Sequence, residues 1–170
     1  DITEQAVRAI KLKETAHGFQ VEKYSETLLP EGAVASGDIK DSNSVRQILE
    51  SIRHEFKTPF VKVSLPDEKT YLFRAEVPVT DGSDMREGIE FILEENVPLN
   101  PAESLFEYEV IPGVSAPNHF SLVVSAISKD LASSTLSLFH NAGFLPIAFG
   151  VRAQAMANAI VPRGNLGTIL

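Results

Sequence analysis

The pattern of hydrophobic and polar residues near the start of the chain is typical of β-strands. Residues 7–13 and 19–28 are two such runs, and the short segment between them ends at Gly18. A glycine at the end of a turn suits a β-hairpin, because it tolerates the backbone angles that tight turns need. Residues 30–37 contain one proline and two glycines, which indicates a loop.

A helix is predicted after this loop, because apolar residues recur at the i, i+3, i+4, i+7, i+11 spacing of one helical face. These residues are Val45, Ile48, Leu49, Ile52 and Phe56. Ser44 and Gln47 together match a capping box at the start of the helix, although Asp41 or Ser42 could cap it instead.

The middle of the chain predicts strands around one helix. Residues 61–65 and 71–77 alternate with a period of two, and residues 66–69 form a turn between them. The helix that follows is capped by Asp84 and ends before Pro98. Its expected buried stripe consists of Met85, Ile89, Ile92 and Leu93. Two further strands are expected at 106–111 and 120–127, and the second is apolar on both faces, which indicates a central position in a sheet.

The last part predicts a helix, a strand and a second helix. The first helix covers about residues 129–142, with Ser128 as its cap and Gly143 just past its end. Its core face is expected to contain Leu131, Leu138 and Phe139. A strand at 145–151 and a helix rich in small residues around Ala153, Met156, Ala157 and Ile160 follow. Residues 162–167 are expected to be a linker, and 167–170 the start of another strand.

This order of elements predicts an α/β fold. With right-handed crossovers, the outer pieces form one mixed α/β layer, and residues 70–127 form an inserted strand-helix-strand-strand module. The length of 170 residues with 44% hydrophobic residues supports one compact core or two small subdomains.

Composition excludes several classes of function. The sequence has no cysteine, which excludes disulfides and thiolate metal sites and fits the cytoplasm. No apolar run is long enough for a membrane span, and the start shows no signal peptide. The net charge of -8 argues against a surface that binds the phosphate backbone, so no nucleic-acid partner is expected.

Motifs for catalysis are absent from the sequence. The four histidines are scattered, and there is no Walker A, GxGxxG, HExxH or Gly-x-Ser-x-Gly pattern. Several aromatic residues belong to the predicted middle module, and core packing is their expected role, with a peptide groove as the alternative. They are Tyr71, Phe73, Phe91, Phe106, Tyr108 and Phe120. No catalytic residue and no metal ligand is therefore assigned.

An ordered series of phrases makes the chain resemble the PilM family, the actin-like and FtsA-related proteins of type IV pilus assembly. The phrases are DIT (1–3), LPEG (29–32), GDIKD (37–41), SLPDEK (64–69), EENVPL (94–99), FEYEVI (106–111) and AGFLPI (142–147). The resemblance implies the N-terminal half of an actin-like ATPase fold. Residues 1–69 and 128–165 would form its subdomain 1A, residues 70–127 the inserted SHS2 subdomain 1C, and residues 166–170 the start of a second half.

The resemblance also implies partners. In the family, the cytoplasmic N-terminal tail of the inner-membrane protein PilN docks between subdomains 1A and 1C, and other pilus assembly platform proteins join them. The chain is therefore expected to be a noncatalytic cytoplasmic scaffold, peripheral to the bacterial inner membrane. We also expect an exposed strand edge after Leu170, which self-association would cover.

A nucleotide site implied by the resemblance falls on residues 1–8. The family's phosphate loop reads Asp-Ile-Gly-Ser-Ser-Ser-Val-Lys, and the residues aligned with ATP and Mg²⁺ contacts are Asp1, Thr3, Gln5 and Arg8. Asp1 and Arg8 match the pattern. Thr3 replaces a glycine that lets backbone approach phosphate, and Glu4 brings negative charge to the loop. ATP and Mg²⁺ are the family's cofactors, and the expectation here is a degenerate or incomplete site.

Two alternatives remain from the sequence. One is an actin-fold ATPase or kinase whose active site is completed after Leu170. The other is a related adaptor of type II secretion or cell division.

Overall fold

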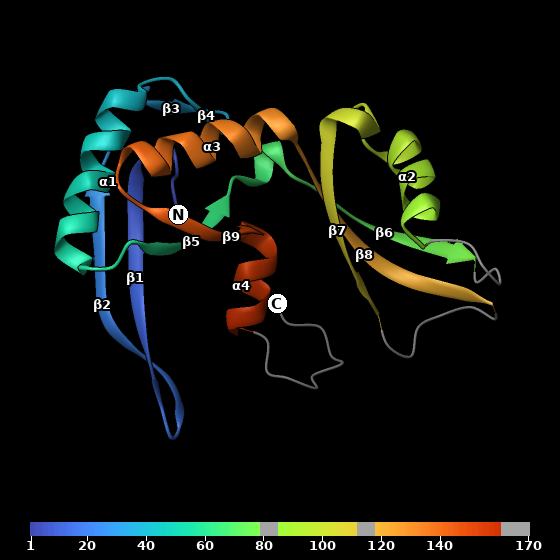
Figure 1. The fold of residues 1–170 in the computed structure, drawn as a ribbon, viewed down its shortest axis with the longest axis horizontal. Coiled ribbons are helices and arrows are strands. Elements are labelled where there is room, and N and C mark those ends of the chain that lie inside the picture. Colours follow the sequence, from blue (N-terminus) through green and yellow to red (C-terminus); the bar gives the residue numbers. More distant parts are fainter. Residues whose placement is uncertain (79–84, 112–117, 161–170) are drawn as a thin grey trace. The chain divides into compact units, whose positions relative to one another are not determined.

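The computed structural model describes residues 1–78, 85–111 and 118–160 of the chain. The chain divides into two compact units, one of Asp1–Glu68 with Thr135–Leu170 and one of Lys69–Ser134. Each unit has its own hydrophobic core, and Figure 1 shows the helices and strands of both units. The predicted cap Asp84 and the predicted linker and strand at 162–170 lie outside the described residues.

The first unit begins with a long hairpin and ends with a parallel strand pair. Its elements are β1 (Ala6–Thr15), β2 (Gly18–Leu28), β3 (Val34–Ala35), β4 (Asp38–Ile39), α1 (Ser42–Phe56), β5 (Phe60–Leu65), the end of α3 (Lys129–Asn141), β9 (Leu145–Val151) and α4 (Arg152–Ile160). Strand β1 pairs with β2 in antiparallel fashion, and β5 pairs with β9 in parallel. Gly18 has a φ of 110°, which explains why glycine ends the hairpin turn.

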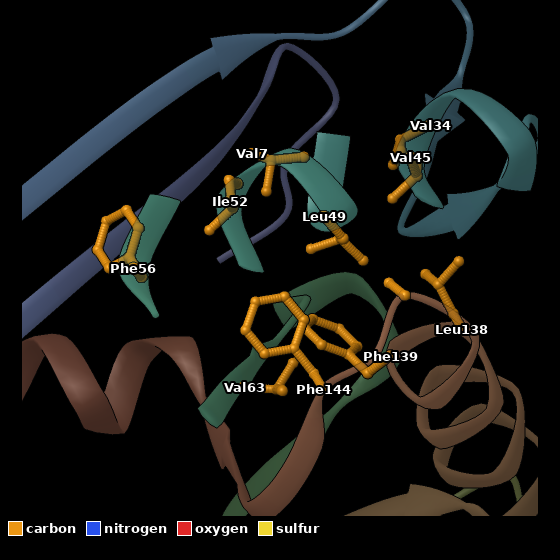
Figure 2. Close-up of a cluster of buried hydrophobic side chains, with 11 residues drawn as sticks. Val7, Val34, Val45, Leu49, Ile52, Phe56, Val63, Leu138, Phe139 and Phe144 are labelled. Atoms are coloured by element: carbon orange, nitrogen blue, oxygen red, sulfur yellow. The ribbon is translucent and has the colours of Figure 1, made fainter. Parts of the chain in front are cut away.

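The core of the first unit forms between helix α1, strand β1 and the α3–β9 junction (Figure 2). The buried residues of α1 are Val45, Leu49, Ile52 and Phe56, which are four of the five residues that the helical spacing predicted. Figure 2 shows the rings of Phe139 and Phe144 beside Val63, and their centroids lie 5.9 Å apart. The apolar periodicity of the sequence thus corresponds directly to the packed surface.

The second unit is a three-stranded antiparallel sheet with one helix. Its elements are β6 (Tyr71–Pro78), α2 (Met85–Asn96), β7 (Ser104–Val110) and β8 (His119–Ser128). The strand order is β6-β8-β7, so the strand that the sequence predicted to be central is central. Ile89 and Leu93 of α2 pack on Ala75 and Val77 of β6 in one buried cluster. The helix therefore covers one face of the sheet.

Asp41, one of the caps that the sequence left open, caps α1, because its carboxylate accepts bonds from Asn43 N and Ser44 N, each at 3.1 Å. Three other details differ from the sequence prediction. Leu131 is only partly buried, and Ala132 takes the buried position one residue later.

Phe91 was expected to pack in the core, but its side chain on α2 is 66% exposed. In addition, the described strands of the first unit form separate two-stranded sheets and not one continuous layer. Among the described residues, no β-ladder connects one of these two-stranded sheets to the next. The hydrophobic pattern therefore identified each strand but not the strands that lie beside it.

Candidate functional site

The first eight residues fold back on themselves immediately before the hairpin continues. Thr3 N donates to Ala6 O at 2.9 Å, Arg8 N donates to Asp1 O at 2.8 Å, and Ile2 forms an isolated antiparallel bridge with Val7. Ala6 and Val7 are buried, which anchors the end of this turn in the core of the first unit. The turn therefore presents residues 1–5 at a fixed place.

The side chains of Thr3 and Arg8 are engaged within the hairpin. Thr3 Oγ1 donates to Ala6 O at 3.0 Å and also lies 3.1 Å from Ala6 N, which can donate to it. Arg8 Nη1 donates to Thr3 Oγ1 at 3.3 Å, and Arg8 Nη2 is 2.8 Å from Glu26 Oε1 on strand β2. The side chains of Thr3 and Arg8 thus bond to the turn itself and to strand β2.

Arg152 connects the N-terminal turn to the far end of the chain. Its Nε donates to Asp1 Oδ1 at 3.0 Å, and its Nη2 donates to Ile2 O at 3.1 Å. Its Nη1 lies 3.8 Å from Asp67 Oδ2. Only 20% of the Arg152 side chain is exposed, so this guanidinium sits between two carboxylates in a partly desolvated place.

Asp67 has a second contact at the same place. Its Oδ1 accepts from Ala153 N at 3.2 Å, at the start of helix α4. A carboxylate at a helix N-terminus satisfies a free backbone donor and complements the helix dipole. Asp67 therefore orders the residues that carry Arg152.

A hollow of about 250 Å³ opens beside this turn. It is lined by Ile2, Thr3, Glu4, Gln5, Arg8, Val34, Gly37, Pro66, Glu68 and Arg152. Two carboxylates and two guanidiniums share its wall, so their formal charges cancel. Glu4 is further held by Ser36 N, which donates to its Oε1 at 2.7 Å.

The structure brings the four residues of the sequence-based site together. Thr3, Gln5 and Arg8 line the hollow, and Asp1 reaches it through its bond to Arg152. Sequence reasoning missed Arg152 and Asp67. They follow the carboxyl ends of the paired strands β5 and β9, where Leu65 and Val151 are in register. Charged residues at this edge of a parallel pair are a recognisable signal, once the pairing is known.

The residues of the hollow do not fit a metal-bound triphosphate well. A phosphate loop needs free backbone amides and an uncommitted carboxylate near the metal. Here Thr3 N and Thr3 Oγ1 bond to Ala6, Asp1 bonds to Arg152, and the carboxylates of Glu4 and Glu68 face the space.

Metal-ligand clusters and membrane-spanning helices are both absent from the described part of the chain. Among the residues with assigned positions, no group of three or more histidine, aspartate or glutamate side chains is arranged to hold a metal ion. Within the same residues, no helix combines the length and apolar character needed to cross a membrane.

Solved structures that share this fold include the two that follow. The chain matches the "PilM-PilN type IV pilus biogenesis complex" with a TM-score of 0.79 and 18% identity, over 92% of this chain and 47% of that chain. It also matches the cytoplasmic domain of EpsL, an inner-membrane component of the type II secretion system of Vibrio cholerae. That match has a TM-score of 0.60 and 12% identity, and covers 86% of this chain and 52% of that chain. The chain thus spans about half the length of either structure.

No curated protein matches the sequence. A family model described as "Type IV pilus assembly protein PilM" matches residues 1–163, which is nearly the whole chain. The likeness to the solved PilM structure agrees with this match and with the α/β fold described above. The chain therefore belongs to the PilM family of type IV pilus assembly proteins.

Proposed function

We propose that this chain is a noncatalytic scaffold of type IV pilus assembly that binds the cytoplasmic tail of a PilN-like protein at the inner membrane. The match of the family model over residues 1–163 is the observation that carries this proposal. One structural neighbour is a complex of PilM with PilN, which supports the choice of partner. Other platform proteins of the same machine would join the assembly through this pair.

The second unit offers a surface suited to a short peptide. Helix α2 covers the sheet face that carries Ala75 and Val77, and leaves the opposite face uncovered by that helix. Leu72 on β6 and Leu105 on β7 point to this opposite face and are 43% and 44% exposed. They flank β8, whose Ser125 is in register with Leu72.

Charged residues surround these two leucines. Glu107 is in register with Ser125, and Arg74 and Glu109 are both in register with Val123, so the three charges share the open face. A peptide with a few apolar anchors and charged flanks would complement this surface, and strands β6 and β7 are the sheet edges to which an extended segment could add.

Calorimetric titration with a synthetic peptide of the PilN-like tail tests the proposal. We expect saturable binding to the purified chain. Leu105→Glu should weaken it by roughly tenfold or more, because a charge would replace an apolar anchor. Phe91→Glu is the matched control, since Phe91 is an exposed apolar residue on α2, away from the open face.

Absence of binding to the unaltered chain would overturn the proposal. Equal loss in the Leu105 and Phe91 variants would place the peptide somewhere other than the open face, provided that both variants keep their circular dichroism and melting temperature.

A degenerate nucleotide site is part of the same proposal. The charges of Asp1, Glu4, Arg8 and Arg152 are satisfied without a ligand, so Mg²⁺ and ATP would have to break existing bonds to enter. The rival reading, an actin-fold ATPase or kinase, requires those bonds to open at modest cost. A thermal titration with Mg²⁺ and ATP separates the two.

An adaptor of type II secretion is the second candidate, because the cytoplasmic domain of EpsL has a related fold. The family model favours the pilus system. Competition between a tail peptide from a PilN-like protein and one from a type II secretion membrane protein decides between them. Tighter binding of the secretion peptide would reverse our choice.

A further inference from the structure

The hairpin of the first unit carries a mostly apolar face that the described fold leaves open. Six large apolar residues of β1 and β2 have between 50% and 76% of their surface exposed. They are Ile10, Leu12, Phe19, Val21, Tyr24 and Leu28. Figure 1 shows the hairpin running well beyond α1 toward its turn.

Register places all six side chains on one face. Ile10 is opposite Tyr24 and Leu12 is opposite Val21, and directly opposed residues point to the same side of an antiparallel pair. Leu28, opposite Ala6, and Phe19, opposite Glu14, continue the face at its two ends.

A β-bulge keeps Val21 and Phe19 on the same side of the hairpin as Tyr24. The register shifts between Lys11 and Leu12, so that Glu22 and Lys23 together oppose one residue. Lys11 Nζ lies 2.7 Å from Glu22 Oε1, so the bulge places Glu22 on the side of Lys11 and Lys23. Without the bulge, strict alternation would send Val21 and Phe19 to that other side.

The other side of the hairpin has a different character. Near its base, Val7 packs in the core, and Lys23 Nζ lies 3.0 Å from Glu55 Oε1 of α1 and 5.5 Å from the centre of the Phe56 ring. Farther out it carries Lys13 and Gln20, which are exposed. The hairpin is therefore amphipathic, and its apolar face is the one without a partner among the described residues.

The size of the face exceeds what a monomer normally exposes. At 50% to 76% exposure, six residues of these types present on the order of 800 Å². The largest apolar patch on a typical monomer is about 300–600 Å², and one side of a standard protein interface is about 800 Å².

The charges on the face permit contact between identical copies. Arg8 and Glu26 lie on it, but they pair with each other at 2.8 Å, which leaves Glu14 near the turn as its remaining charge. The lysines of the hairpin, at positions 11, 13 and 23, belong to the other side. Two copies can therefore meet here with little repulsion, although the chain as a whole carries a net charge of -8.

We infer that the apolar face of the β1–β2 hairpin is a homotypic interface, on which a second copy of this chain packs face to face around a two-fold axis. An elongated, mostly apolar face whose Arg8 and Glu26 pair with each other can be self-complementary under such an axis, with the turn end of one hairpin over the base of the other. The inference is independent of the tail-binding surface on the second unit.

Sedimentation equilibrium of the purified chain tests this interface. The unaltered chain should dimerise with rising concentration, and Val21→Glu should raise the dimer dissociation constant by roughly tenfold or more. Gln20→Glu is the matched control, because it adds the same charge one residue away on the polar side and should leave the constant unchanged. Monomers at every concentration, or equal effects of both substitutions, would overturn the inference.

Crosslinking gives a second readout that does not depend on a loss of association. The chain has no cysteine, so a single introduced cysteine can form a disulfide only with another copy. Leu12→Cys, near the middle of the apolar face, should give a covalent dimer on mild oxidation, and Lys13→Cys on the opposite side should not. Crosslinking of the Lys13 variant alone would contradict the two-fold arrangement.

Discussion

Arg152 and Asp1 are separated by 151 positions in the chain, yet Arg152 Nε lies 3.0 Å from Asp1 Oδ1. The same guanidinium also bonds Ile2 O and lies near Asp67, so one side chain joins three segments of the first unit. The bond holds the N-terminal turn against the carboxyl end of the parallel β5–β9 pair. A positive charge fixed by the protein thus offsets part of the negative charge of Asp1 and Asp67 there.

Replacement of Arg152 by methionine should destabilise the chain by about 1–2 kcal/mol, because it leaves a partly desolvated carboxylate and a backbone carbonyl without their donor. Arg152→Lys should recover only part of this loss, since an ammonium cannot reproduce the planar set of donors. Urea unfolding followed by circular dichroism measures the difference.

Arg46→Met is the matched control for this prediction. Arg46 pairs with Glu50 one turn along α1, where both side chains are more than a third exposed, and exposed pairs of this kind contribute about 0.3–0.5 kcal/mol. Equal losses in the Arg46 and Arg152 variants would show that the Arg152 cluster is an ordinary surface contact.

Addition of Mg²⁺ and ATP should leave the melting temperature unchanged. A ligand at 100 times its dissociation constant would stabilise the folded state by about 2.7 kcal/mol, which is readily detected. We expect no such shift, because the groups that would receive phosphate and metal are bonded to Ala6 and Arg152. A saturable rise with Mg²⁺ and ATP, absent with Mg²⁺ alone, would favour the nucleotide-binding alternative.

Stability should depend on pH through Asp41. Its pKa is lowered from 3.8, first by the hydrogen bond from the Ser44 side chain and also by the backbone N–H groups of Ser44 and Asn43. A lowered pKa in the folded state means that the contribution is fully present above pH 3.8 and is lost as the pH falls through the folded-state value. The melting-temperature difference between the unaltered chain and Asp41→Ala should therefore shrink at strongly acid pH.

Asp41→Asn separates charge from capping in this experiment. Asparagine is also a good N-cap but does not titrate, so its advantage over alanine should be independent of pH. If the aspartate and asparagine chains show the same pH dependence relative to alanine, ionisation of Asp41 is not the cause.

Local elements were predictable from the sequence because local chemistry decides them. The spacing of Val45, Leu49, Ile52 and Phe56 specified both the helix α1 and its buried side. Gly18 specified the turn of the hairpin, and the run around Leu122 and Val124 indicated the central strand of the second unit. Each of these features depends on neighbours only a few residues away.

Features that depend on distant pairing were not predictable. The role of Arg152 needs the parallel register of Leu65 with Val151, and the apolar face of the hairpin needs the bulge at Glu22. Strict alternation along the strand would have divided Tyr24 and Val21 between opposite sides. The residues of the candidate site came from the family resemblance. Only the fold shows that Asp1 is already paired with Arg152 and that Arg8 is already paired with Glu26.

Gly88 in helix α2 gives a last test, because its helix position and its packing predict opposite effects of alanine. Alanine inside a helix normally stabilises it by about 0.5–1 kcal/mol relative to glycine. A Cβ at Gly88, however, would lie 2.8 Å from Val77 Cγ1, and Val77 is a stiff, β-branched side chain with only 4% exposure. Overpacking of this kind costs about 1–3 kcal/mol, so Gly88→Ala should be destabilising by roughly 1 kcal/mol overall.

A double-mutant cycle with Val77→Ala, measured by urea unfolding, should show that Gly88→Ala turns stabilising once the Val77 methyl groups are gone. Additive effects of the two substitutions would mean that α2 shifts away from β6 to relieve the contact, and that the close approach of Gly88 is not needed for the packing of this unit.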